Sequence, residues 1–185
     1  MVKETRGLRE KVIFLLTLLL VIAITVVLFL YRDKISEFGE LGYLGAFLIS
    51  LVANATIILP MPGLLLLFAL GSVFNPLLVG LVGAVGGSIG ELSGYIAGYS
   101  GRGIVRSNNW FIRAERWMKR WGTLTIFVFS LVPLLPFDAA GMVAGVLHFP
   151  VWKFWLACFL GKALLYILIT LSGAWGWEIL LRCIA

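Results

Sequence analysis

Fifty consecutive residues, 41–90, contain no charged side chain, and prolines and glycines interrupt this stretch at two points. One membrane-crossing helix needs only about twenty apolar residues, so a single straight helix cannot account for the stretch. The interruptions, Pro60-Met61-Pro62-Gly63 and Asn75-Pro76, predict segments over 43–59, 64–74 and 77–99. The middle segment would extend only roughly 16 Å as a helix, whereas the hydrocarbon core is about 30 Å thick. We therefore expect a hairpin that enters the membrane, turns at Pro60, Pro62 and Gly63, and leaves on the same side.

The composition excludes most soluble classes. Hydrophobic residues make up 61% of the 185-residue chain and charged residues 13%, against roughly 25% charged residues in a soluble domain. This length accommodates one membrane domain (residues 1–185) and leaves no room for a soluble catalytic domain. Cys158 and Cys183 have neither the spacing of a disulfide framework nor that of a metal site. We expect no enzyme, no metal and no cofactor.

The first hydrophobic run covers residues 12–31. It is longer than the apolar region of a typical signal peptide and lacks a small-residue cleavage pattern. We interpret it as a retained transmembrane helix.

The breaker residues recur after 74 positions. The offset aligns Pro62 with Pro136, Gly71 with Gly145, Pro76 with Pro150, and Gly87 with Gly161. The second unit would run inward over 122–135, turn at Pro133 to Pro136, return over 139–148 and continue as a long helix over 151–172. The alternative is that glycine and proline are simply scattered, as in many membrane proteins. We favour two repeat units, residues 43–99 and 122–173.

Basic residues orient these units. They precede the first helix and lie between the two units: Lys3, Arg6, Arg9, Lys11, Arg102, Arg106, Arg113, Arg116, Lys119 and Arg120. The 32–40 loop instead carries two basic and three acidic residues. The positive-inside rule then places the N-terminus and the central loop in the cytoplasm. The units would be inverted, an architecture common among secondary transporters, in an all-α multi-pass protein of the cell (inner or plasma) membrane.

Three ionisable residues, Glu91, Asp138 and Lys162, lie within hydrophobic segments. Placing each in the membrane costs about 2.5–3.5 kcal/mol on insertion scales, so each should have a partner or face water. Asp138 is expected near the start of a half-helix, where capping of free N–H groups is the structural alternative to a functional role. Lys162 either forms a structural ion pair with Glu91 or Asp138, or binds a substrate phosphate.

The first long segment carries a stripe of small residues: Gly86, Gly90, Gly94 and Gly98. Such a stripe lets a second helix approach closely, so we expect packing and allow for a homo-oligomer. Glu91, Tyr95 and Tyr99 share the same four-residue spacing, which puts a carboxylate and two phenols on one face.

The central loop has the pattern of an amphipathic helix over 104–121. Trp110, Ala114, Trp117 and Trp121 alternate with a basic row one residue earlier. An aromatic face beside a basic face is typical of a helix at the cytoplasmic membrane surface. Nucleic-acid binding is the weaker alternative, and we expect no nucleic-acid partner.

From Asn54 to Ser172 the chain resembles the DedA family of the VTT (SNARE-associated) membrane-domain superfamily. The matching motifs are Pro60-Met61-Pro62-Gly63 with Gly71, Gly90-Glu91 with Tyr95 and Gly101-Arg102, and Pro133-Leu134-Leu135-Pro136-Phe137-Asp138 with Gly141, Gly145 and Phe149. The resemblance implies two re-entrant hairpins in an inverted repeat. It also implies transbilayer movement of lipid, such as a polyprenyl phosphate carrier or a phospholipid, with proton coupling in some members.

Three departures mark a divergent member. Where the family commonly has an acidic residue after the first Pro-Gly, this chain has Leu64. Ser130 and Pro136 stand where members commonly have arginines. Arg102 and Lys162 remain as basic candidates for a headgroup.

The leading hypothesis is a flippase or scramblase that moves a phosphate-bearing lipid. Glu91, Asp138, Lys162, Arg102 and Tyr95 are the candidate substrate or proton-coupling residues, and membrane lipids and protons the partners. One alternative is a proton-coupled exporter of a small solute or cation. The other is a non-transporting membrane scaffold assembled through the glycine stripe.

Overall fold

The chain folds into helices. The structure, a computed structural model, describes residues 39–55, 60–101, 109–133, 135 and 137–184, with Leu19 and Ala23. The helices are α3 (Glu40–Ala55), α4 (Pro60–Val73), α5 (Pro76–Gly90), α6 (Leu92–Tyr99), α7 (Asn109–Trp121), α8 (Thr123–Leu131), α9 (Phe137–Val146) and α10 (Val151–Ile184). The transmembrane helix expected over 12–31 lies outside the described residues, apart from Leu19 and Ala23, which are helical.

Local chemistry sets several helix starts. The Asn75 side chain accepts hydrogen bonds from the backbone N–H of Leu77 (3.0 Å) and Leu78 (3.3 Å), and Pro76 occupies the first helical position of α5. This combination is typical of a capped helix N-terminus. Gly122 has a φ of +43°, which a residue with a side chain rarely adopts, and it makes the corner between α7 and α8.

Among the described residues, two helical stretches are long and apolar enough to cross a membrane, Pro76–Tyr99 and Val151–Gly176. The first combines α5 and α6, which are separated only at Glu91. At about 1.5 Å per residue, 24 and 26 residues extend well beyond the roughly 30 Å of a hydrocarbon core. The helices α3, α4 and α9 are apolar but shorter than 18 residues.

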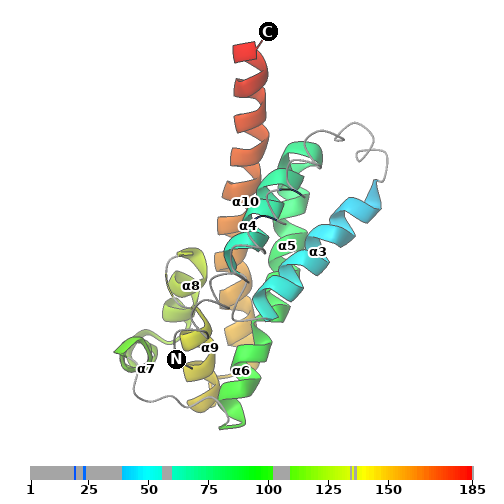
Figure 1. The fold of residues 1–185 in the computed structure, drawn as a ribbon. Helices are drawn as coiled ribbons and strands as arrows, with labels where there is room; N and C mark the ends of the chain where they lie inside the picture. Colours follow the sequence, from blue (N-terminus) through cyan, green and yellow to red (C-terminus); the bar gives the residue numbers. More distant parts are fainter. Residues whose placement is uncertain are drawn as a thin grey trace, which may run out of the picture.

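The shorter helices pack around the two long ones (Figure 1). Helix α3 lies against α5, and α8 lies against α10. Helix α4 also packs on α10, while α9 packs on α6. Each long helical stretch therefore contacts helices from both halves of the chain.

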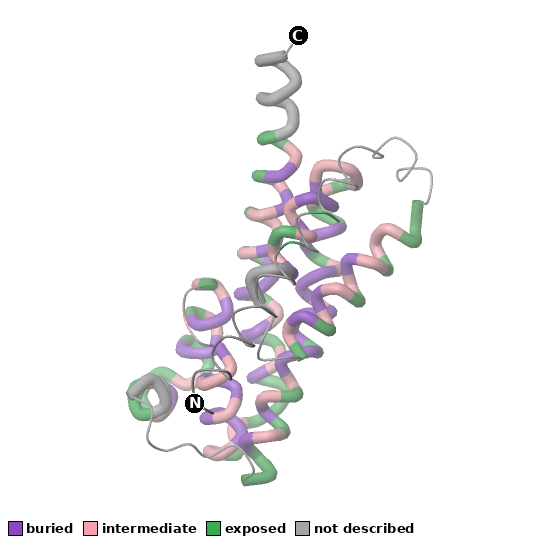
Figure 2. Tube along the Cα trace, in the orientation of Figure 1, coloured by how far each residue is buried: buried purple, intermediate pink, exposed green. Residues whose placement is uncertain are grey.

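The buried apolar side chains form two clusters, and Figure 2 shows buried residues on the facing sides of the helices. One cluster joins α3, α4, α5 and α10 and includes Leu67, Val79 and Tyr166. The other joins α6, α8, α9 and α10 and includes Phe129 and Phe154. Because both clusters include residues of α10, this helix connects the two halves of the core.

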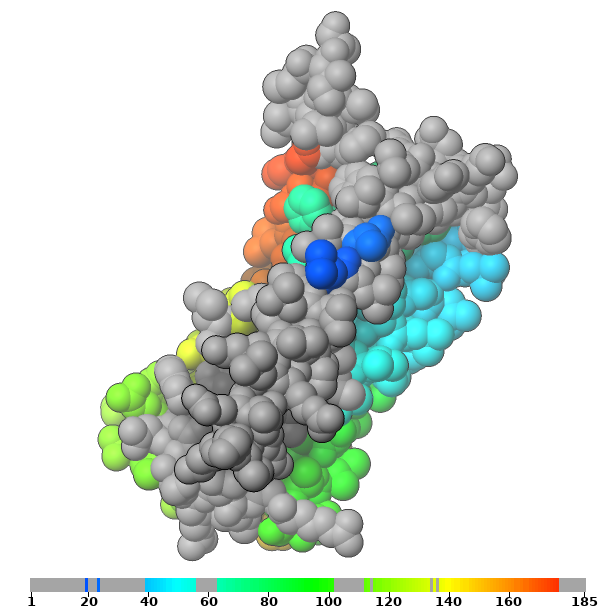
Figure 3. All heavy atoms as spheres, in the orientation of Figure 1, coloured from blue at the N-terminus to red at the C-terminus, as the bar shows by residue number. Residues whose placement is uncertain are grey.

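The outer ends of α3 and α4 lie side by side. The Tyr43 and Phe74 rings have centroids 5.5 Å apart, and α3 and α4 contact each other. These ends lie at one end of the molecule and α7 at the other (Figure 1). In Figure 3 the exposed side of α3 forms one flank, well away from α7.

The prediction that the chain turns at Pro60 to Gly63 is wrong. Pro60 to Gly63 are the first residues of α4 rather than a turn before it. Proline is compatible with the first helical turn, because the backbone N–H groups there have no partner within the helix. The expected helix at 64–74 thus begins four residues earlier.

The second turn lies closer to its predicted place. Helix α8 ends at Leu131 and α9 begins at Phe137, so Pro133 falls between them, while Pro136 lies outside the described residues. The return helix begins two residues before the expected Ala139. The amphipathic helix is described from Asn109, and residues 104–108 of its expected range lie outside the described part.

Candidate functional site

A buried ion pair joins the two long helical stretches. Lys162 Nζ lies 2.9 Å from Glu91 Oε1, and the two side chains are only 7% and 6% exposed. Glu91 occupies the junction of α5 and α6, and Lys162 lies in the middle of the 151–176 stretch. Of the two partners that the sequence allowed for Lys162, the structure selects Glu91.

Asn54, near the C-terminal end of α3, binds the lysine of this pair. Lys162 Nζ also donates to Asn54 Oδ1 at 2.6 Å, and Asn54 Nδ2 donates to the Ser50 carbonyl at 2.6 Å and to Tyr166 Oη at 3.0 Å. We call Asn54, Glu91, Lys162 and Tyr166 the polar cluster. Its hydrogen bonds join α3, the α5–α6 junction and α10.

Gly87 makes room for the polar cluster. A Cβ atom at this position would lie 3.0 Å from Tyr166 Oη, 3.1 Å from Asn54 Nδ2 and 3.2 Å from Lys162 Cδ. A side chain on this turn of α5 would press on three members of the polar cluster, which would have to shift by a few tenths of an ångström. The small glycine one turn before Glu91 leaves these side chains the space that they occupy.

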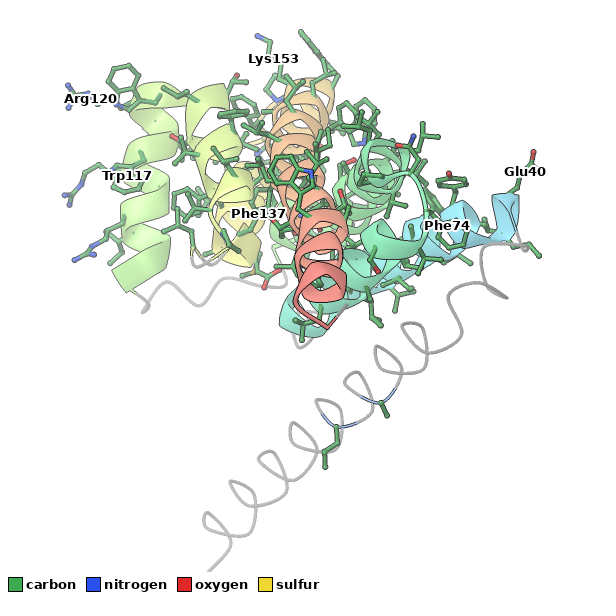
Figure 4. All side chains as sticks on the ribbon, turned by 90° about the horizontal axis from the view of Figure 1, so that it is seen from above. Glu40, Phe74, Trp117, Arg120, Phe137 and Lys153 are labelled. Carbon is green, nitrogen blue, oxygen red and sulfur yellow. The ribbon has the colours of Figure 1, made fainter. Side chains whose placement is uncertain are left out.

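The first residue of α9 also lies at this lysine. Lys162 Nζ lies 5.3 Å from the centre of the Phe137 ring, at the first residue of α9, and 5.6 Å from the Tyr166 ring. Both distances are typical of a cation over an aromatic face. In Figure 4 the labelled Phe137 lies beside α10. The end of α3 and the start of α9 therefore meet at one ammonium group.

Asp138 lies in the first turn of α9 and is partly buried. An acidic residue is favourable there, because the helix dipole presents positive charge at its N-terminus. Within the described part of the chain, Lys162 forms its ion pair with Glu91 and not with Asp138. Asp138 follows Phe137, whose ring lies 5.3 Å from Lys162 Nζ, but Asp138 is not a hydrogen-bonded member of the polar cluster.

A neighbouring hydroxyl in α3 is buried without a partner. Ser50, one turn before Asn54, is 1% exposed, and its Oγ makes no hydrogen bond within the described part of the chain. Most buried polar atoms in proteins have a hydrogen-bond partner, so the Ser50 hydroxyl is an exception. It lies one turn before Asn54 of the polar cluster.

Tyr95 has a structural contact. Its Oη donates to the Phe149 carbonyl at 2.7 Å, and its ring packs on Phe154 with centroids 5.2 Å apart. Tyr95 is 5% exposed. It therefore fixes the loop between α9 and α10 rather than joining Glu91.

Three of the four stripe glycines permit close helix contacts. A Cβ atom at Gly86 would meet the Phe47 carbonyl of α3, one at Gly90 the Leu51 carbonyl, and one at Gly98 the Met142 carbonyl of α9. A Cβ atom at Gly94 would meet no atom within 4 Å. The stripe therefore serves α3 at one end and α9 at the other.

Ser130 and Leu64, which stand where family members commonly have charged residues, lie in close-packed or apolar surroundings. Ser130 is 4% exposed and donates to the Phe127 carbonyl at 2.9 Å. The Ser130 Oγ occupies the space where a Cβ atom at Gly161 would lie. A side chain larger than that of serine at position 130 would therefore separate α8 from α10. Leu64 packs against the core cluster of α3, α4, α5 and α10.

Two expected residues, Arg102 and Pro136, lie outside the described residues. Among the residues that are described, no three His, Cys, Asp or Glu side chains are close enough to hold a metal ion.

Sequence reasoning missed Asn54, Tyr166 and Ser50. Tyr166 lies four residues after Lys162, so the helical period places both on one face, and this signal was available. Asn54 is one of only two asparagines in the uncharged stretch 41–90. Nothing in the sequence shows that this amide would meet a lysine 108 residues later.

The comparisons with known proteins identify the family of the chain. The model of the VTT domain matches residues 61–175, more than half of the chain, and includes Glu91, Asp138 and Lys162. No curated protein and no solved structure matches the chain. VTT domains are membrane domains linked in general to transport, and the apolar helices fit that setting. The chain is a membrane protein of the VTT domain family, which is the DedA family.

Proposed function

We propose that this protein moves a phosphate-bearing lipid across the bilayer, as a flippase or scramblase. The observation that carries this proposal is the buried Glu91–Lys162 pair, held by Asn54 where the α3 end and the α9 start meet. Intramembrane ionisable residues are costly and typically mark a substrate or ion pathway. A lysine ammonium is also a common partner for phosphate.

Paired contacts support an inverted repeat of two hairpins and two long helices. Gly98 of α6 meets the Met142 carbonyl of α9, and Gly173 of α10 meets the Phe68 carbonyl of α4. Met142 lies 74 positions after Phe68, which is the offset of the breaker residues. We propose that both hairpins are re-entrant, and that the N-terminus and α7 face the cytoplasm at the cell membrane.

The proposed mechanism is an exchange of partners at Lys162. With Glu91 ionised, the ammonium is held by the carboxylate at 2.9 Å and by Asn54. Protonation of Glu91 would remove that negative charge and release the ammonium for a headgroup phosphate. Proton uptake and lipid binding would thereby be coupled at one site.

Asp138 has a modulating role in this proposal. Its carboxylate lies in the first turn of α9, where free N–H groups would otherwise attract an anion. Asp138→Asn should leave binding of a phosphate-bearing lipid intact and change its pH dependence. Lys162→Met should weaken that binding.

The test is transport in reconstituted liposomes with fluorescent lipids that differ only in the phosphate. The proposal expects faster transbilayer movement of the phosphorylated lipid than of the neutral lipid. Equal movement of both would contradict phosphate recognition and favour an unselective scramblase. Proton-driven solute flux without lipid movement would favour the exporter, and no movement of any kind the scaffold.

A further inference from the structure

A second candidate lipid site lies at the surface, at the corner between α7 and α8. A pocket of about 190 Å³ is lined there by Trp117, Trp121, Leu124, Thr125 and Val128. Pockets that enclose a whole small molecule measure about 300–1,000 Å³. This pocket is therefore suited to part of a molecule, such as one segment of an acyl chain.

The helix corner builds the pocket. The positive φ of Gly122 turns the chain so that Trp117 and Trp121 of α7 face Leu124 and Val128 of α8. Within each pair the residues are four apart, on one helix face. The Trp117 ring is held edge-on to the buried Phe129 ring, with centroids 5.8 Å apart. The Trp117 wall of the pocket therefore packs against the core.

The apolar wall is open to the surroundings. Trp121 is 57% exposed and Leu124 is 51% exposed. Two large apolar side chains with that exposure, next to a pocket, form a surface that favours hydrocarbon over water.

The mouth of the pocket is basic. The Arg120 guanidinium carbon lies 5.6 Å from the centre of the Trp121 ring, and Figure 4 shows the Arg120 side chain extending away from the bundle. Helix α7 carries four basic residues, Arg113, Arg116, Lys119 and Arg120, and one acidic residue, Glu115. Glu115 pairs with Lys119 at 2.8 Å, which leaves an excess of positive charge on the helix.

We propose that the α7–α8 pocket binds one anionic phospholipid, with an acyl segment in the pocket and its phosphate on Arg120. The charge of α7 selects an anionic lipid over a zwitterionic one, and the apolar walls select a lipid over free phosphate. This site is separate from the polar cluster and holds α7 at the membrane surface. It does not depend on the proposed transport activity.

The experiment measures tryptophan quenching in the full-length protein, reconstituted in phosphatidylcholine vesicles. Brominated phosphatidylglycerol is added in one series and brominated phosphatidylcholine in another, and the difference between the two reports the anionic site. The proposal expects stronger quenching by the anionic lipid. Equal quenching in the two series would overturn it.

Three variants separate the parts of the site. Arg120→Gln should raise the anionic-lipid fraction for half-maximal quenching by about fivefold, the effect of one basic side chain at an anionic surface. Val128→Phe should fill the pocket and remove most of the selective quenching. Lys153→Gln is the matched control, because Lys153 also lies over a tryptophan, Trp152, at 5.4 Å, but neither lines this pocket.

Each pattern of results decides the proposal. Loss in Arg120→Gln and Val128→Phe with no change in Lys153→Gln supports it. Equal loss in Lys153→Gln would show general surface attraction, and full selectivity in Val128→Phe would show that no chain occupies the pocket; either overturns it. If Val128→Phe does not fold, as judged by gel filtration, Leu124→Phe at a more exposed wall position replaces it without adding a tryptophan.

Discussion

Two opposite charges at the centre of the molecule stabilise each other only as a pair. Glu91 and Lys162 are almost fully buried, and Lys162 has a second partner in Asn54. Breaking a buried pair by removing one member costs about 3–5 kcal/mol, because the other charge remains without a partner. Replacing both members costs less.

We therefore expect Lys162→Met to lower the free energy of unfolding by about 3–5 kcal/mol. The double variant Glu91→Gln/Lys162→Met should regain a large part of that loss, because no buried charge is left alone. Unfolding in mixed micelles, followed by circular dichroism, measures both. A double variant as unstable as Lys162→Met would show that the pair does not act as a unit.

Asn54 should matter because it orients the lysine. Asn54→Leu keeps the size of the side chain but removes the acceptor of Lys162 Nζ and the donor to Tyr166 Oη. An unsatisfied buried polar group costs about 1–3 kcal/mol, more when charged, so we expect at least that loss of unfolding free energy.

Ser93→Ala is the matched control for Asn54→Leu. Ser93 is exposed and donates to the carbonyl of Ala55, beside Asn54, at 3.3 Å. We expect its removal to change stability by no more than about 0.5 kcal/mol. Equal effects of the two substitutions would contradict a specific role for Asn54.

At this scale the sequence predicts which residues are unusual but not how they are joined. Glu91 and Lys162 are conspicuous because charge is rare in an apolar segment. Their pairing depends on how α5, α6 and α10 pack, and Asn54 enters only through the same packing. Tyr95 is the opposite case. It lies four residues after Glu91, which predicts a shared helix face, but its hydroxyl donates a hydrogen bond to the Phe149 carbonyl.

At the scale of elements, glycines decide which helices touch. Gly98 and Gly94 lie one turn apart on α6, yet only Gly98 faces a neighbour. Alanine has a helix propensity about 1 kcal/mol better than glycine, so the effect of substitution depends on the space available.

Gly98→Ala should therefore destabilise the protein, because its Cβ would meet the Met142 backbone, which cannot move aside cheaply. We expect a cost of about 1–3 kcal/mol for this overpacking. Gly94→Ala, its control, should be neutral or stabilising by up to about 1 kcal/mol. Thermal unfolding in detergent compares the two, and a Gly98→Ala variant as stable as Gly94→Ala would contradict the observed α6–α9 contact.

Element boundaries show where sequence reasoning reaches its limit. The prolines correctly indicate that one helix ends and another begins nearby. Pro60 and Pro62, however, belong to the first turn of α4 and not to the turn before it. Proline is compatible with a turn and with a helix start alike, so the residue type alone does not choose between them. The GxxxG spacing likewise predicts close packing without saying which glycines face α3 and which face α9.

At the scale of the whole molecule, the ends of the first hairpin define its topology. The Tyr43 and Phe74 rings lie together, and α3 begins at the opposite end of the molecule from α7 (Figure 1). If the hairpin is re-entrant, both positions face the same compartment.

Single cysteines at Tyr43 and Phe74, in a chain without its native cysteines, test this topology. We expect both to react with a membrane-impermeant thiol reagent from the outside, and a cysteine at the exposed Lys119 to react only from the cytoplasmic side. The readout is mass-tagging in intact cells and in inverted vesicles. Labelling of Tyr43 and Phe74 from opposite sides would make the first hairpin a full crossing.

The most direct test of the central claim is lipid transport by Glu91→Gln in reconstituted liposomes. Glutamine keeps the shape of the side chain and an acceptor for Lys162, but it does not titrate. Glu115→Gln on the surface of α7 is the matched control, since it also removes one carboxylate beside a lysine. The account predicts that Glu91→Gln still folds, with lower stability because Lys162 loses its charged partner. It should transport the phosphorylated lipid far more slowly, because a side chain fixed in the neutral form cannot take up and release the proton, while Glu115→Gln transports normally. Undiminished transport by Glu91→Gln would contradict the claim that the buried pair couples protons to lipid movement.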